Sequence, residues 1–106
     1  MSISGPSTIA IDTDTFKNST LKEFVGQDKI IYLGRSSFLG TNLPSFENRI
    51  ITDIPSLTFN SSSLKSFNLS SAPLTRIGDY VFDDCKMLNH GWLPKTLSYL
   101  GAQCFG

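Results

Sequence analysis

The chain of 106 residues carries nine basic and nine acidic side chains, so its formal net charge is zero. That balance removes the simplest electrostatic reason for binding nucleic acid or an anionic membrane surface. The length fits a single domain over residues 1–106 or a fragment of a longer array, and no apolar run approaches about 18 residues, the length that predicts a transmembrane helix.

An apolar pattern with a period of 21–23 residues runs along the chain. Phenylalanine returns at intervals of 22, 21, 23 and 23 residues, as Phe16, Phe38, Phe59, Phe82 and Phe105. An aliphatic residue stands five positions before each of them, as Ile11, Leu33, Ile54, Ile77 and Leu100. A leucine follows the first three by five positions and the fourth by six, as Leu21, Leu43, Leu64 and Leu88. The pattern predicts about five structural repeats.

In the third unit the predicted elements are an extended stretch over 64–69, a second over 74–77, and a corner over 78–82 that can form one helical or 3-10 turn. The apolar stripe of a long amphipathic helix is absent. One unit cannot fold alone, because ordering it costs roughly 30 kcal/mol, at about 1.5 kcal/mol per residue. Each of its five or six core side chains returns only about 1.5–3 kcal/mol on burial. The units are therefore predicted to stack as a solenoid whose apolar positions form ladders.

The clearest motif is Leu74-Thr-Arg-Ile-Gly-Asp-Tyr-Val-Phe-Asp-Asp-Cys85, which continues through residues 87–94 and 96–105. This motif resembles the BspA-type leucine-rich repeats. The resemblance implies an α/β leucine-rich-repeat solenoid of mostly short parallel strands with brief helical or 3-10 turns, in about four complete coils and a partial fifth. The sequence departs from the family pattern in places. Units one to three lack the cysteine after Phe, Gly91 replaces an aliphatic strand residue, and Asp12 and Pro55 stand where glycine is expected.

In leucine-rich-repeat proteins generally, the strands line a concave face, and the residues between the leucines point outward to contact the partner. Carried over by position, this implies a partner-binding set of Lys22, Glu23, Val25, Ser45, Glu47, Lys65, Ser66, Asn68, Asn89, His90 and Trp92. Trp92 beside His90 is its most suggestive pair, because tryptophan is enriched at binding hot spots. The alternative interpretation is that Trp92 covers an exposed edge or packs on a following unit.

Catalytic chemistry has little support in the sequence, and we expect no enzyme. Cys85 lies five residues before His90, the single histidine, so a Cys/His nucleophile pair is conceivable. The resemblance, however, places Cys85 in a buried cysteine column, where a thiol acts as a small apolar group. No disulfide is expected between Cys85 and Cys104, because they occupy different places in their units.

No metal or cofactor site is expected either. Two cysteines and one histidine without CxxC spacing do not form a convincing metal site. Acidic residues crowd two corners without the ligand spacing of a calcium-binding loop, so we interpret them as solvated turn residues: Asp12, Asp14, Asp79, Asp83 and Asp84. The glycine motifs that bind nucleotide phosphates are absent.

The predicted function is a non-catalytic protein-binding module, within a surface adhesin or host-interaction protein as the resemblance implies. The alternatives are an intracellular scaffold and an element that self-assembles end to end, because the last unit stops at Phe105-Gly106 without a recognisable cap. The first eight residues do not read as a signal peptide, so the location is the cell surface if the resemblance holds and the cytoplasm otherwise. Three glycosylation sequons matter only in a secreted eukaryotic protein, at Asn18, Asn60 and Asn68.

Overall fold

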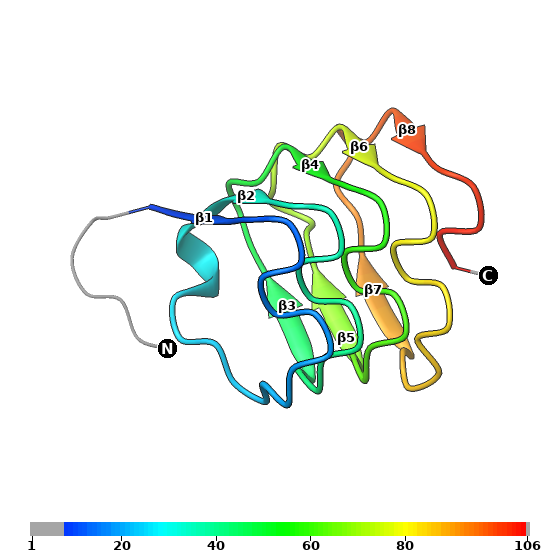
Figure 1. The fold of residues 1–106 in the computed structure, drawn as a ribbon. Coiled ribbons are helices and arrows are strands. Elements are labelled where there is room, and N and C mark those ends of the chain that lie inside the picture. Colours follow the sequence, from blue (N-terminus) through cyan, green and yellow to red (C-terminus); the bar gives the residue numbers. More distant parts are fainter. Residues whose placement is uncertain (1–7, 106) are drawn as a thin grey trace.

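The chain folds as a parallel β-solenoid in a computed structural model that describes residues 8–105 (Figure 1). Successive coils lie side by side from the N-terminal to the C-terminal end, and each coil repeats the path of the one before it. The prediction of a stacked solenoid of mostly short parallel strands is confirmed. No signal peptide was expected over residues 1–8, and residues 1–7 of that segment lie outside the described part of the chain.

Two ladders of short parallel strands run along the solenoid. One is formed by β1 (Ile9–Ile11) with β2 (Ile30–Leu33) and continues along the same side in β4 (Asp53–Ile54), β6 (Arg76–Ile77) and β8 (Tyr99–Leu100). The other consists of β3 (Ser45–Glu47), β5 (Ser66–Asn68) and β7 (His90–Trp92). The second, third and fourth coils thus supply one strand to each ladder, and the described part of the fifth supplies β8 alone. The first coil has no strand over 21–26 and instead forms the 3-10 helix η1 (Gln27–Lys29).

The corners between the ladders hold the phenylalanine column. Neighbouring rings stack with centroids 5.4, 5.5, 5.8 and 5.3 Å apart from Phe16 to Phe105, at interplanar angles of 2–18°. The aliphatic residues five positions earlier form a parallel column, of which Ile11, Leu33, Ile54 and Ile77 are almost fully buried. These two columns run through the buried core from coil to coil, which is why the period in the sequence predicts the fold.

The corner backbone alternates in handedness. At the first four corners, the residues two positions before and two positions after the column Phe have positive φ, as at Ser36 (φ 59°) and Gly40 (φ 71°) around Phe38. Alternate N–H groups therefore point in different directions: that of Phe38 donates to Thr58 in the next coil at 3.0 Å, while that of Leu39 donates to Ser36 within the turn at 3.2 Å. The expected helical or 3-10 turn at the corner is replaced by these linked turns, because they also hydrogen-bond one coil to the next.

The place of the family's cysteine after Phe is taken by hydroxyl residues in the first three coils: Ser19, Thr41 and Ser62. Thr41 Oγ1 donates to the carbonyl of Phe38 at 2.9 Å. Cys85 Sγ donates to the carbonyl of Phe59 at 3.0 Å and lies 3.5 Å from Ser62 Oγ. A small side chain with one donor satisfies this position, so the missing cysteines do not disturb the fold.

Asn48 makes a buried polar anchor in a column that the period reserves for apolar residues. It is 1 % exposed. Its Nδ2 donates to the carbonyls of Gln27 and Ile30 at 2.8 and 2.9 Å, and its Oδ1 accepts from the N–H groups of Ile50 and Ile51, both at 2.8 Å. All four hydrogen-bonding positions of the amide are filled, so the side chain ties the residue after β3 to η1 and to the first residue of β2.

Candidate partner-binding face

The strands β3, β5 and β7 place two columns of side chains on the outer side of their sheet. Phe46 and Phe67 point into the core, so the residues on either side of them point outward. The parallel register then aligns Ser45 with Ser66 and His90 in one column and Glu47 with Asn68 and Trp92 in the other. We call these six residues the β3–β5–β7 face. All six belong to the set predicted from the sequence.

The other five predicted residues lie elsewhere. Lys65 and Asn89 directly precede β5 and β7, and the N–H of Asn89 donates to the carbonyl of Lys65 at 3.0 Å, so both border the face. Lys22, Glu23 and Val25 are exposed but belong to the first coil, which has no strand here. They do not extend the sheet, so the prediction that they do is wrong. Gly26, at φ 101°, turns the chain into η1 at the place where a strand would continue.

Gln27, which the sequence interpretation missed, takes the place of the absent strand. Its Nε2 donates to the carbonyl of Ser45 at 3.1 Å, and its Oε1 accepts from the N–H of Glu47 at 2.9 Å. The side-chain amide thus pairs with β3 as a neighbouring peptide group would. Because an open strand edge invites pairing with another chain, Gln27 protects this edge of the sheet. No spacing in the sequence marks it, since it lies outside every repeated column.

A hollow of about 300 Å³ lies on the β3–β5–β7 face. It is lined by Ser45, Phe46, Glu47, Ser66, Phe67, Asn68 and Trp92. The buried rings of Phe46 and Phe67 lie beneath it, while Trp92 is 52 % exposed. The imidazole of His90 stacks on the indole of Trp92 with centroids 5.8 Å apart and planes 8° apart, which restrains the orientation of both rings.

The polar groups in the hollow are largely uncommitted. Within residues 8–105, the Glu47 carboxylate and the hydroxyls of Ser45 and Ser66 make no hydrogen bond or ion pair. The Oδ1 of Asn68 accepts from the N–H and the hydroxyl of Ser70 at 3.1 and 2.7 Å, which fixes the amide and leaves its Nδ2 available as a donor. The face therefore presents acceptors and donors that nothing in the described fold uses.

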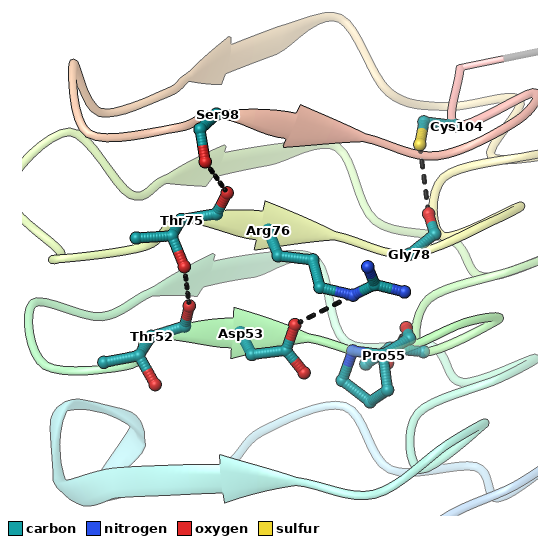
Figure 2. A network of polar contacts seen from close by, with 9 residues as sticks. Thr52, Asp53, Pro55, Thr75, Arg76, Gly78, Ser98 and Cys104 are labelled. Atoms are coloured by element: carbon teal, nitrogen blue, oxygen red, sulfur yellow. Dashed lines mark hydrogen bonds and ion pairs between the residues drawn. The ribbon is translucent and has the colours of Figure 1, made fainter.

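The outward column on the opposite ladder differs, because its members bind one another (Figure 2). Arg76 Nε lies 3.5 Å from Asp53 Oδ1, and its guanidinium lies 4.4 Å from the centroid of the Tyr99 ring. Beside this column, Thr75 Oγ1 donates to the carbonyl of Thr52 at 3.3 Å, and Ser98 Oγ donates to that of Thr75 at 3.2 Å. The polar groups of this face serve contacts between coils.

The two thiols are free and face the backbone of neighbouring residues. Burial raises the pKa of Cys85 despite its hydrogen bond with Ser62, and burial also raises the pKa of Cys104, whose Sγ donates to the carbonyls of Gly78 and Gly101 at 3.0 Å (Figure 2 shows the bond to Gly78). Raised pKa values disfavour the thiolate that a nucleophile requires.

Across residues 8–105, no three His, Cys, Asp or Glu side chains gather as a metal site. No helix among these residues is long and apolar enough to cross a membrane.

Comparison with known proteins gives one match. The sequence model described as BspA type leucine rich repeat region (6 copies) matches residues 7–106, almost the whole chain. No curated protein and no solved structure matches. The structure has five phenylalanine corners over residues 16–105, close to the number of copies in that description.

Proposed function

Because the chain belongs to the BspA-type leucine-rich repeat family, we propose that it is a non-catalytic module that binds a protein partner through the β3–β5–β7 face. Leucine-rich repeats generally mediate protein interactions, and solenoids of this kind are typically non-catalytic. The sheet that carries the face supplies a rigid support, which lowers the entropic cost of ordering side chains on binding.

One observation carries the proposal: the two outward columns are used differently. Arg76 is bound on both sides, by Asp53 and by Tyr99. On the other ladder, Glu47 has no side-chain partner among residues 8–105, and Trp92 is half exposed. An exposed tryptophan next to uncommitted polar groups is typical of a binding hot spot rather than of a structural contact.

The test compares two triple variants. Replacing Lys65, Asn68 and Trp92 by alanine removes side chains from the face and its border, and the matched control replaces Asp53, Arg76 and Tyr99 on the opposite ladder. Both folded proteins and the wild type are used to capture partners from host extracts and from extracts of the producing cell. A partner that wild type and control retain and the face variant loses supports the proposal, once its affinity has been measured with purified protein. Equal retention by all three contradicts it.

The setting we favour is a surface adhesin or host-interaction protein, and the rival is an intracellular scaffold that uses the same face. Glycosylation separates them. At Asn60 a glycan would displace the hydrogen bond from Nδ2 to the carbonyl of Tyr80, now 3.1 Å long. Asn18 is exposed on a corner and is the better acceptor. A glycan at Asn18 in protein from the native source, or detection at the cell surface, supports the adhesin.

Self-association is a second candidate, favoured by the apolar surface of the last coil. Large apolar side chains are exposed there at Met87, Trp92, Leu93, Tyr99, Leu100 and Phe105. The backbone edges of β7 and β8 have no neighbouring strand among the described residues. Stacking of this end on the opposite end of a second chain, however, would require Gln27 to leave the edge of β3. Concentration-dependent light scattering on the isolated chain separates this candidate from a monomeric binding module.

A further inference from the structure

The hollow on the β3–β5–β7 face combines a large exposed ring with uncharged polar groups and one carboxylate. We propose that it binds an uncharged pyranose sugar carried by the partner. The inference rests on the proposed function, since it assigns a ligand class to the same face. It is argued from the lining residues, their register and their charge.

Trp92 supplies the surface on which a sugar ring can stack. One face of a pyranose consists mainly of C–H groups, which pack on the electron-rich face of an indole while the hydroxyls at the ring edge stay free for hydrogen bonds. Trp92 lines the hollow and is 52 % exposed, and the stacked His90 ring holds its plane. A restrained ring loses little side-chain entropy on binding.

The polar groups match the hydroxyls of a sugar, each of which can donate and accept. Glu47 offers two acceptor oxygens, Asn68 offers the donors of Nδ2, and the hydroxyls of Ser45 and Ser66 can do either. Glu47, Asn68 and Trp92 stand in register on three adjacent strands. Since neighbouring strands lie about 4.8 Å apart, Glu47 and Trp92 are separated by about 10 Å at the backbone. A sugar ring fits between the carboxylate and the indole, above Asn68.

Charge and size narrow the ligand class. Lys65 borders the face, but the residues that line the hollow include no Lys or Arg, so phosphorylated, sulfated or nucleotide ligands would meet one carboxylate and no cation among them. A volume of about 300 Å³ stands at the lower end of small-molecule sites, which suits one or two rings. A Lys or Arg side chain of a protein partner could use Glu47 and Trp92, but it would face the donor amide of Asn68. A neutral sugar uses all three.

Trp92 is the single tryptophan of the chain, so its fluorescence reports on the hollow directly. The full chain is titrated with neutral disaccharides, namely maltose, cellobiose, lactose and N,N′-diacetylchitobiose, up to sugar concentrations of tens of millimolar. A parallel arm uses N-acetyl-arginine amide as the cationic probe. The variants Glu47→Ala and Asn68→Ala keep the reporter, and Asp53→Ala and Asn42→Ala are matched controls outside the hollow. Near-ultraviolet circular dichroism confirms that each variant is folded.

We expect saturable binding of at least one disaccharide, weakened about tenfold in Glu47→Ala and Asn68→Ala, which corresponds to the loss of one or two hydrogen bonds. The controls should bind as the wild type does. No saturable response to any disaccharide, or saturation by the arginine amide alone, overturns the inference. If the triple face variant has lost its protein partner while the sugars fail to bind, only the sugar inference falls. The sugar inference alone also falls if the protein captures an enzymatically deglycosylated partner as strongly as the untreated partner.

Discussion

The ring of Phe67 fills the space in which a side chain of residue 91 would lie. Gly91 is the register partner of Phe67 in the next strand, and a Cβ added there would have three Phe67 ring atoms within 3.0 Å. The same ring stacks on Phe82 with centroids 4.5 Å apart and planes 9° apart. The missing side chain of Gly91 is thus compensated by the ring of Phe67 one coil earlier.

This relationship predicts coupling between positions 67 and 91. Gly91→Leu restores the family pattern but crowds the ring, so we expect a cost of about 1–3 kcal/mol in the free energy of unfolding. Phe67→Leu alone should also destabilise, because it leaves a void beside Phe82. The double variant should be more stable than the sum predicts, by about 0.5–3 kcal/mol. Urea denaturation of the four proteins completes the cycle, and strict additivity would show that the ring and residue 91 do not compete.

Ser37 is predicted to be a site where a smaller side chain stabilises the protein. It is fully buried, and its Oγ has no hydrogen-bond partner. Thr58, at the same position of the next coil, is also buried but donates to the carbonyl of Pro55 at 2.7 Å. Ser37→Ala should therefore raise the free energy of unfolding by about 1 kcal/mol, since an unpaired buried group costs about 1–3 kcal/mol.

Thr58→Ala is the matched control, because it removes a hydroxyl that is satisfied. We expect it to lower the free energy of unfolding by about 1 kcal/mol, the net value of one hydrogen bond. Thermal and urea unfolding measure both variants. A loss of stability in Ser37→Ala as large as that in Thr58→Ala would mean that the Ser37 hydroxyl is paired in solution.

The thiols predict a loss of stability at alkaline pH. Burial raises the pKa of Cys85 above its ordinary value of 9.0, so the folded state holds the thiol proton more tightly than the unfolded state. The stabilisation is fully present below pH 9.0 and is lost as the pH rises through the folded-state pKa. Cys85→Ser keeps the donor that Ser62 and Thr41 supply in earlier coils, and it does not titrate in this range. Between neutral and alkaline pH, the free energy of unfolding should therefore fall less for Cys85→Ser than for the wild type. Both proteins have the same tyrosines and lysines, so these groups affect the two curves equally. Parallel pH curves would contradict the prediction.

The core of this fold was predictable from the sequence because every coil buries apolar side chains at equivalent positions. Phe59 stacks on its counterparts in the coils on either side, and Ile54 is fully buried in register with Ile77, so both stand out as members of the period. The corner conformation was not predictable in the same way. Positive φ occurs at Leu57 and Tyr80, residue types that do not favour it, because the hydrogen bonds between coils determine the backbone there.

The candidate site was predictable only where strands form. Because Glu47, Asn68 and Trp92 have equivalent positions between the leucines, the sequence predicted that they lie together. The parallel register aligns such positions from coil to coil. It failed at Val25 because the first coil ends in η1 rather than in a strand. Gln27 could not be predicted for a related reason. Its side chain pairs with β3 at one sheet edge only, and a contact that is made once leaves no repeated pattern in the sequence.

Gln27 is predicted to keep the β3 edge closed to other chains. Gln27→Met removes both hydrogen bonds to β3 at nearly constant volume, so we expect a loss of about 1–3 kcal/mol in the free energy of unfolding, from two bonds of about 0.5–1.5 kcal/mol each. The freed N–H of Glu47 and carbonyl of Ser45 should also promote pairing between chains, seen as larger species in sedimentation velocity. Gln103→Met is the control, because Gln103 is exposed at the last corner and its side chain makes no hydrogen bond within residues 8–105. It adds the same apolar side chain without opening an edge, and it should sediment as the wild type does. If both methionine variants associate equally, the added apolar surface explains the association and the edge does not.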